Sequence, residues 1–326
     1  MPIICPVCQT PVDPVRSIGG HVSPLNKQRY SLYSCGSCRL EFWHPLKIDP
    51  SIYGTETCFM YVMFHQGDAN LLPPSRYFLK HFPHPKPAGR RPRLLDIGCG
   101  NGALLAAAEK LGYEVWGLDL DEKSIAAAKN VFGLKDVFAL TLDEFAAKIG
   151  GQAGRFDVVM FVEVLEHQED PLGFVRQAKN LLAPGGVIVG SVPNRERLWA
   201  EAERKNGVDW PPHHLLRLSK GSLRRLFARL GPADVRFRPM GYGLLEFANW
   251  LEILLFGPLI TRTKAWINRT RFQGRDSAGN RRKLNALWLM KKCLNAAFVP
   301  LALLLFPFWL VASRRGHQIY FEVRYD

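Results

Sequence analysis

The chain has 326 residues, of which 47% are hydrophobic and 22% charged, and this composition excludes a disordered chain. Seven cysteines are too few for a disulfide scaffold, and the first ten residues lack a secretion signal, so we expect a cytoplasmic protein. The net charge of +14 divides into +4 over residues 1–90, −3 over residues 91–195 and +13 over residues 196–326. The acidic central third counts against a nucleic-acid-binding surface there.

Two CxxC pairs stand near the start of the chain. Cys5 and Cys8 form the first CxxC motif and Cys35 and Cys38 the second, with 26 residues between the two motifs. Each CxxC turn directs two thiolates at one tetrahedral ion, so the four cysteines predict a zinc ribbon with a closed, structural Zn²⁺ site. A redox pair is the alternative. The metal would replace the hydrophobic core that about forty residues cannot build.

The next segment separates this ribbon from the rest of the chain. Residues 54–82 have a weak helical pattern. Residues 83–93 are rich in proline and basic residues, which predicts a linker and a domain boundary.

A strand, a glycine turn and a helix follow the linker. An apolar run over residues 93–98 ends at glycine, and residues 103–111 favour a helix. A second expected strand, residues 114–118, ends at Asp119 and is followed by another helix that begins near Asp121. An acid at this position is placed to hold ribose hydroxyls. The glycine pattern is GxGxG, so the GxGxxG fingerprint of dinucleotide binding is not matched.

Strands and helices continue to alternate toward the C-terminus, which predicts an α/β fold with seven strands and helices on both faces of a mostly parallel sheet. The last strand is expected to be antiparallel, because no short helix precedes it. The remaining expected strands are residues 136–140, 156–162, 186–192, 234–238 and 317–325, and the remaining helices lie near 170–182 and 219–230.

Four segments in this order resemble class I S-adenosylmethionine-dependent methyltransferases, and most of all the subgroup that includes the ubiquinone-pathway O-methyltransferases. They are LLDIGCGNG (94–102), VWGLDLDEKSIAAAK (115–129), FDVVMFVEVLEHQEDP (156–171) and LLAPGGVIVGSVPN (181–194). The resemblance covers roughly residues 93–230 and implies a seven-stranded Rossmann-like sheet. Residues 43–53 and 209–227 are similar to bacterial relatives that carry an N-terminal zinc ribbon.

The resemblance implies where the methyl donor binds. Asp96 would fix the glycine loop and the ammonium group of S-adenosylmethionine, and Asp119 would accept hydrogen bonds from its ribose. For both aspartates the alternative is a helix N-cap or a loop acid. The expected cofactor-binding residues are Asp96, Gly98, Cys99, Gly100, Gly102, Asp119, Leu120, Leu142 and Val162.

Methyl transfer requires alignment of donor and acceptor, and a base where a hydroxyl must lose its proton. The candidate catalytic residues are Glu163, His167, His213 and His214. Glu163, Glu166 and His167 have helical spacing, and the resembled O-methyltransferases hold a divalent cation with such a set. The alternative places Glu163 beside the cofactor and gives His167 a structural hydrogen bond.

An insertion precedes the last strand. Residues 244–260 are mainly apolar, residues 294–312 are uncharged, and residues 262–292 between them carry a net charge of +9. We expect a helical hairpin that enters one leaflet at the inner face of the membrane, with its basic part on anionic headgroups. A soluble cap or a dimer interface is the alternative.

These features predict a methyltransferase that acts on an oxygen of a small or lipid-linked acceptor at the membrane surface. The alternatives are an RNA methyltransferase and a non-catalytic module that binds S-adenosylmethionine. The predicted domains are the zinc ribbon (1–48), the helical segment with its linker (49–92), the methyltransferase core (93–243), the apolar and basic insertion (244–315) and the last core strand (316–326).

Overall fold

The computed structural model of the chain divides into two compact units. One contains residues 1–240 and 318–326, and the other residues 241–317. The structure describes residues 3–48, 64–65, 67, 73–83, 87, 89–150, 155–197, 200–205, 209–240, 247, 251, 299–310 and 316–325.

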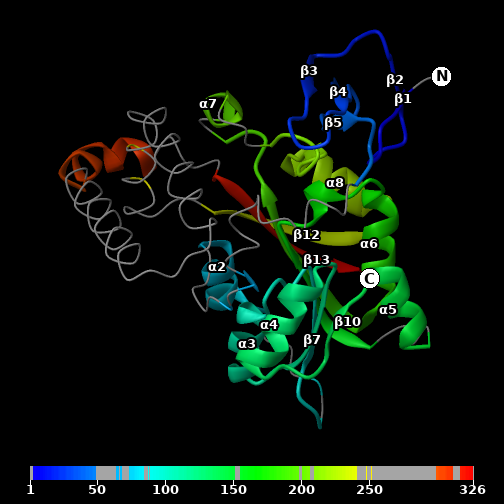
Figure 1. The fold of residues 1–326 in the computed structure, drawn as a ribbon, viewed down its shortest axis with the longest axis vertical. Helices are drawn as coiled ribbons and strands as arrows, with labels where there is room; N and C mark the ends of the chain where they lie inside the picture. Colours follow the sequence, from blue (N-terminus) through cyan, green and yellow to red (C-terminus); the bar gives the residue numbers. More distant parts are fainter. Residues whose placement is uncertain are drawn as a thin grey trace, which may run out of the picture. The chain divides into compact units, whose positions relative to one another are not determined.

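A seven-stranded sheet forms the centre of the first unit (Figure 1). Its strands are β6 (Arg93–Ile97), β7 (Glu114–Asp119), β8 (Val137–Ala139), β9 (Phe156–Val162), β10 (Leu182–Pro193), β12 (Ala233–Met240) and β13 (Gln318–Tyr325). They lie in the order β12-β13-β10-β9-β6-β7-β8. Strand β13 is antiparallel to both neighbours, and the other neighbouring strands are parallel. The predicted fold class, including the antiparallel last strand, is confirmed.

Helices cover both faces of this sheet (Figure 1). On one face lie α2 (Pro73–His81), α3 (Ala103–Lys110) and α4 (Glu122–Phe132), and on the other α5 (Leu142–Lys148), α6 (Pro171–Asn180) and α8 (Lys220–Ala228). Two hydrophobic clusters match these layers. One includes Phe78 of α2 and Leu105 of α3, and the other Val175 of α6 and Phe227 of α8. Helix α7 (Ala200–Lys205) lies between β10 and β11 in the chain.

The N-terminal ribbon shares a sheet with a strand from residues 93–243. Its strands are β1 (Ile3–Ile4), β2 (Pro11–Val12), β3 (Gly19–Val22), β4 (Arg29–Ser34) and β5 (Glu41–His44). Strand β11 (Leu216–Arg217) pairs antiparallel with β5, which gives a four-stranded sheet in the order β11-β5-β4-β3. Ribbon residue Phe42 and core residue Leu218 belong to the same hydrophobic cluster. This shared sheet was not predicted from the sequence.

The second unit has a small hydrophobic cluster of its own. Residues 299–310 are helical, and Ala302 and Trp309 pack with Phe247 and Leu251. Most of the predicted insertion, residues 244–315, lies outside the described residues. Within the part of the chain that is described, no helix combines the length and apolar character needed to span a bilayer.

Candidate functional site

The loop between β6 and α3 requires glycine. Gly98, Gly100 and Gly102 have φ angles of 82°, 54° and 76°, in the left-handed region that favours glycine. A Cβ atom at Gly98 would lie 2.5 Å from Cγ2 of Val164. The backbone N–H of Gly98 donates to the carbonyl of Leu118 at 2.7 Å, which ties this loop to the end of β7.

Two aspartates stand where β6 and β7 end. Asp119 accepts hydrogen bonds from the backbone N–H of Gly100 at 2.8 Å and of Asp121 at 2.9 Å. Asp96 is buried, and its Oδ1 atom has no hydrogen-bond partner. Burial, with a smaller effect from the charge of Asp119, raises the pKa of Asp96 to about 8. A buried acceptor of this kind needs a cationic or hydrogen-bonding ligand, and the ammonium group of S-adenosylmethionine fits that need.

The other expected cofactor residues differ in exposure. Leu120 follows Asp119 and is 48% exposed, so it offers apolar surface beside the ribose-binding candidate. Cys99 and Leu142 are buried, and Val162 is the last residue of β9. Leu142 is the first residue of α5, a helix that begins with a capping box between Thr141 and Glu144.

Phe64 and His65 were not predicted from the sequence as site residues. The Phe64 ring lies against Gly100, where a Cβ atom would be 3.1 Å from the ring. Nε2 of His65 lies 2.5 Å from Oδ2 of Asp121, the N-cap of α4. The weak helical pattern of residues 54–82 was the only available signal.

Glu163 follows β9 in a left-handed backbone conformation with φ of 55°. Its backbone N–H donates to the carbonyl of Ser191 at 3.0 Å, and its Oε1 accepts the Ser191 hydroxyl at 2.8 Å. Burial raises the pKa of Glu163 to about 7, although the Ser191 hydrogen bond opposes this shift. The carboxyl group is therefore held against β10.

Glu166, His167 and His214 form a second cluster next to it. Glu166 is fully buried, neither of its carboxylate oxygens has a hydrogen-bond partner, and burial raises its pKa well above the usual range. Nδ1 of His167 contacts the backbone carbonyl of His213, and its Nε2 lies 3.9 Å from Oε1 of Glu166. The rings of His167 and His214 meet edge to face with centroids 4.9 Å apart.

The possible ligand atoms of Glu166, His167 and His214 all lie within 4.8 Å of one another. Two imidazoles and a carboxylate suit a divalent transition-metal ion. This group differs from the expected set of Glu163, Glu166 and His167, because His214 takes the place of Glu163.

The carboxylate of Asp209 contacts the ring of His214. Oδ1 of Asp209 lies 3.4 Å from Nδ1 of His214, and its Oδ2 accepts from Nη2 of Arg197 at 2.8 Å. Burial alone would raise the pKa of Asp209, but the His214 hydrogen bond and the Arg197 charge outweigh it and lower this pKa below its usual value. His213 is half-buried, and burial lowers the pKa of its ring.

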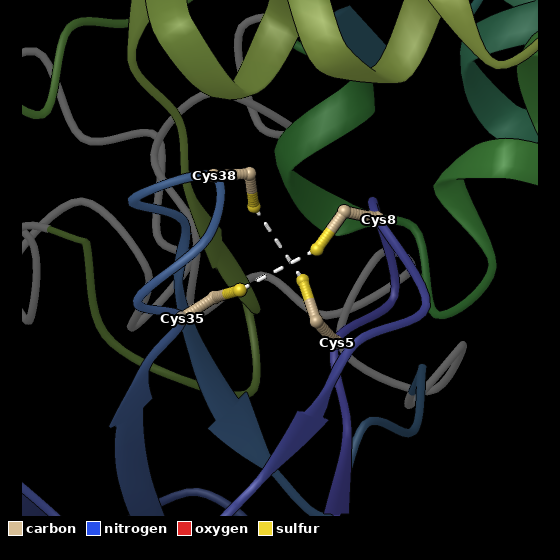
Figure 2. Close-up of side chains that lie close together, drawn as sticks. All are labelled: Cys5, Cys8, Cys35 and Cys38. Carbon is tan, nitrogen blue, oxygen red and sulfur yellow. Dashed lines mark hydrogen bonds between the residues drawn. The ribbon is translucent and has the colours of Figure 1, made fainter.

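The four ribbon cysteines point their sulfur atoms toward one another (Figure 2). The Sγ atoms of Cys5 and Cys38 are 3.6 Å apart, those of Cys8 and Cys35 are 3.4 Å apart, and all four lie within 4.8 Å. Zinc–sulfur bonds of about 2.3 Å in a tetrahedron place sulfur atoms about 3.8 Å apart, so the cluster fits Zn²⁺. These short contacts join one CxxC turn to the other, which favours a shared metal over a redox pair.

The strand order, the glycine loop and the aspartates at the carboxyl edge of the sheet are those of the S-adenosylmethionine-dependent methyltransferase fold. Residues 70–235, just over half of the chain, match the family model described as a methyltransferase domain. The chain belongs to this family.

Two curated relatives are ubiquinone biosynthesis O-methyltransferases. The protein of Caulobacter sp. (strain K31) is 38% identical over 161 residues, which are 45% of this chain and 63% of the relative. That of Ruegeria pomeroyi is 42% identical over 106 residues, which are 32% of this chain and 42% of the relative. This chain therefore matches less than two thirds of the length of either protein.

Among solved structures, a similar one is a SAM-dependent methyltransferase from Archaeoglobus fulgidus. The two chains are 19% identical, with a TM-score of 0.49, and the match covers 82% of this chain and 99% of the other.

Proposed function

We propose that this protein transfers a methyl group from S-adenosylmethionine to an oxygen atom of a small or lipid-linked acceptor at the cytoplasmic face of a membrane. The observation that carries the proposal is the unpartnered carboxyl oxygen of Asp96, which precedes the glycine loop at the end of β6, and a histidine and carboxylate cluster follows β9. S-adenosylmethionine supplies an electrophilic methyl group, and the chain has to align it with the acceptor.

On the donor side, the proposed roles follow the contacts. Asp96 would bind the ammonium group, and the glycine loop lets the backbone approach the ligand closely. Asp119, already fixed by two backbone N–H groups, would receive the ribose hydroxyls. Leu120 would cover an apolar part of the ligand.

On the acceptor side, His214 is the proposed base, and His167 lies beside it. Burial lowers the pKa of His167 to about 3, so its imidazole is neutral at pH 7 but only weakly basic, and its proposed role is to position the acceptor. His214 is oriented by Asp209, in the manner of a base held by a carboxylate. Glu163 would face the acceptor from the end of β9, while His213 contributes its carbonyl to His167.

As an alternative to base catalysis by His214, the three residues Glu166, His167 and His214 would hold a divalent cation, because a ring nitrogen that binds a metal cannot also accept the proton. The Nδ1 atoms of His167 and His214 contact the His213 carbonyl and the Asp209 carboxylate, and contacts of this kind commonly orient metal-binding histidines. Such a cation would supply Lewis-acid activation of the acceptor hydroxyl.

The oxygen acceptor is supported by the name of the two curated relatives, which are O-methyltransferases. A membrane surface is supported by the helix over residues 299–310, where Leu303, Leu304 and Phe308 are 55%, 71% and 76% exposed. The adjoining residues 262–292 carry a net charge of +9, which suits anionic headgroups.

A transfer assay tests the function. The purified protein is incubated with methyl-labelled S-adenosylmethionine and a cell extract, and the extract is then separated into lipid, small-molecule and RNA fractions. We expect label in the lipid or small-molecule fraction. Label confined to RNA would support the RNA methyltransferase instead, and donor binding by calorimetry without any transfer would indicate a non-catalytic module.

A further inference from the structure

Strand β5 of the ribbon is hydrogen-bonded to the segment that carries His214. The backbone N–H of Trp43 donates to the carbonyl of Leu215 at 2.9 Å. The N–H of Leu215 donates in turn to the carbonyl of Glu166 at 2.9 Å. Leu215 thus connects the ribbon directly to the turn that holds Glu166 and His167.

The Trp43 side chain makes a second connection to this segment. Its indole Nε1–H donates to the backbone carbonyl of Asp209 at 3.2 Å, and both residues are buried. The guanidinium group of Arg217 lies 5.0 Å from the centre of the Trp43 ring and directs two nitrogen atoms at the same carbonyl, each at 3.4 Å. One backbone oxygen is therefore held by two side chains, of which one belongs to the ribbon.

The backbone of Asp209 needs such support. Its φ angle is 60°, in the left-handed region that is uncommon for residues other than glycine. Residues in this state persist where their surroundings fix them. With its carbonyl held by Trp43 and Arg217, Asp209 presents its carboxylate to Arg197 on one side and to Nδ1 of His214 on the other.

We propose that Trp43 is a positioning residue for methyl transfer, and that the ribbon orients the acceptor side of the site through Trp43, Asp209 and His214. The Asp209 carboxylate receives the Nδ1–H of His214, which directs the Nε2 atom toward the acceptor. This inference rests on the proposed function for the role of His214. It implies that changes in the ribbon at Trp43 alter the turnover of the acceptor and leave the binding of S-adenosylmethionine unchanged.

Trp43→Phe tests this role, because it removes the donor atom and keeps an aromatic ring. Tyr33→Phe is a matched control, since the Tyr33 hydroxyl also donates to a backbone carbonyl, that of Pro14, but within the ribbon. Both variants are compared with the wild type in zinc content, donor affinity, steady-state transfer to the fraction that the wild type labels, and the NMR resonance of the His214 Nδ1–H, assigned by its loss in His214→Gln.

We expect Trp43→Phe to lower kcat about fivefold or more, with an unchanged Kd for S-adenosylmethionine, and to shift or abolish the Nδ1–H resonance. Tyr33→Phe should match the wild type in all of these. A wild-type resonance and kcat in Trp43→Phe, or the same losses in Tyr33→Phe, would overturn the proposal.

Two further outcomes are decided by other measurements. If Trp43→Phe loses its zinc, Arg217→Lys replaces it as the test, because this change removes the neighbouring contact to the same carbonyl from outside the ribbon. We expect the same loss of kcat and the same change in the Nδ1–H resonance, and wild-type values of both would overturn the proposal. If the wild type labels no fraction, the proposed function fails, and the resonance alone decides whether Trp43 orients His214.

Discussion

Asp96, on the donor side of the site, lowers the stability of the protein when no ligand is bound. A buried carboxyl group with an unpartnered oxygen lowers stability when it ionises, and a cationic ligand restores the balance. The same atom that weakens the free protein is thus available to bind the ammonium group.

Asp96→Asn should therefore have two opposite effects. The Kd for S-adenosylmethionine should rise about tenfold or more, because a charge-assisted hydrogen bond is lost. Free wild-type protein should lose stability as the pH rises from about 4 toward 8, since the folded state keeps a proton on Asp96 that the unfolded chain releases. The asparagine variant lacks this loss. The difference in free energy of unfolding between the variant and the wild type, measured by urea denaturation, should therefore favour the variant more at pH 8 than at pH 5.

Histidine substitutions separate acceptor chemistry from donor binding. His214→Ala should lower turnover about a hundredfold, the usual scale of general-base catalysis, and His167→Ala should also lower turnover, because the acceptor is no longer positioned. Both variants should leave the Kd for S-adenosylmethionine unchanged. Calorimetry and the transfer assay measure the two quantities separately. Unchanged turnover in both variants would remove the histidines from the mechanism.

At the scale of elements, the loop between β6 and α3 can be compared with a loop of similar backbone conformation. Gly133, the C-cap of α4, has a φ angle of 70°, but a Cβ atom there would meet nothing within 4 Å. Gly133→Ala should lower the free energy of unfolding by about 1 kcal/mol and leave donor affinity intact. Gly98→Ala adds the contact with Val164 and should also weaken donor binding more than tenfold by calorimetry. Equal donor affinities in the two variants would contradict this role for Gly98.

The ribbon is the element whose stability should depend on metal. Under reducing conditions the purified chain should contain roughly one zinc ion, measured by elemental analysis. Cys35→Ser should lose that zinc and lower the thermal midpoint. A metal-free wild type with disulfides inside its CxxC pairs would support the redox alternative.

The sequence was sufficient for features that depend on local patterns, and insufficient for those that depend on distant contacts. Apolar runs that alternate with helical patterns predicted the seven strands, and two CxxC pairs predicted the cysteine cluster. Strand β11 has only two residues, too few for a periodic pattern, and its partner β5 lies far away in the chain. The left-handed conformation of Asp209 and its contact with Trp43 depend on that pairing, so neither could be predicted. For the same reason His214 was not placed in the cluster with Glu166.

At the scale of the whole molecule, charge and apolar surface are unevenly distributed along the chain. The acidic third contains the glycine loop and both aspartates, whereas the last third carries a net charge of +13. Within that last third, the helix over residues 299–310 exposes several large apolar side chains. Attraction to anionic lipid and insertion of apolar side chains would then act together, and salt would weaken only the first.

Vesicle sedimentation tests this attachment on the full chain. The wild type should sediment with vesicles that contain anionic lipid at low salt, and less with neutral vesicles or at high salt. The double variant Leu304→Asp, Phe308→Asp should bind less at every salt concentration, because charged side chains replace exposed apolar ones. Val15→Asp makes the same kind of change at an 87% exposed ribbon residue and should bind like the wild type. Wild-type protein that stays in the supernatant with anionic vesicles at low salt would leave residues 244–315 as a cap or a dimer interface.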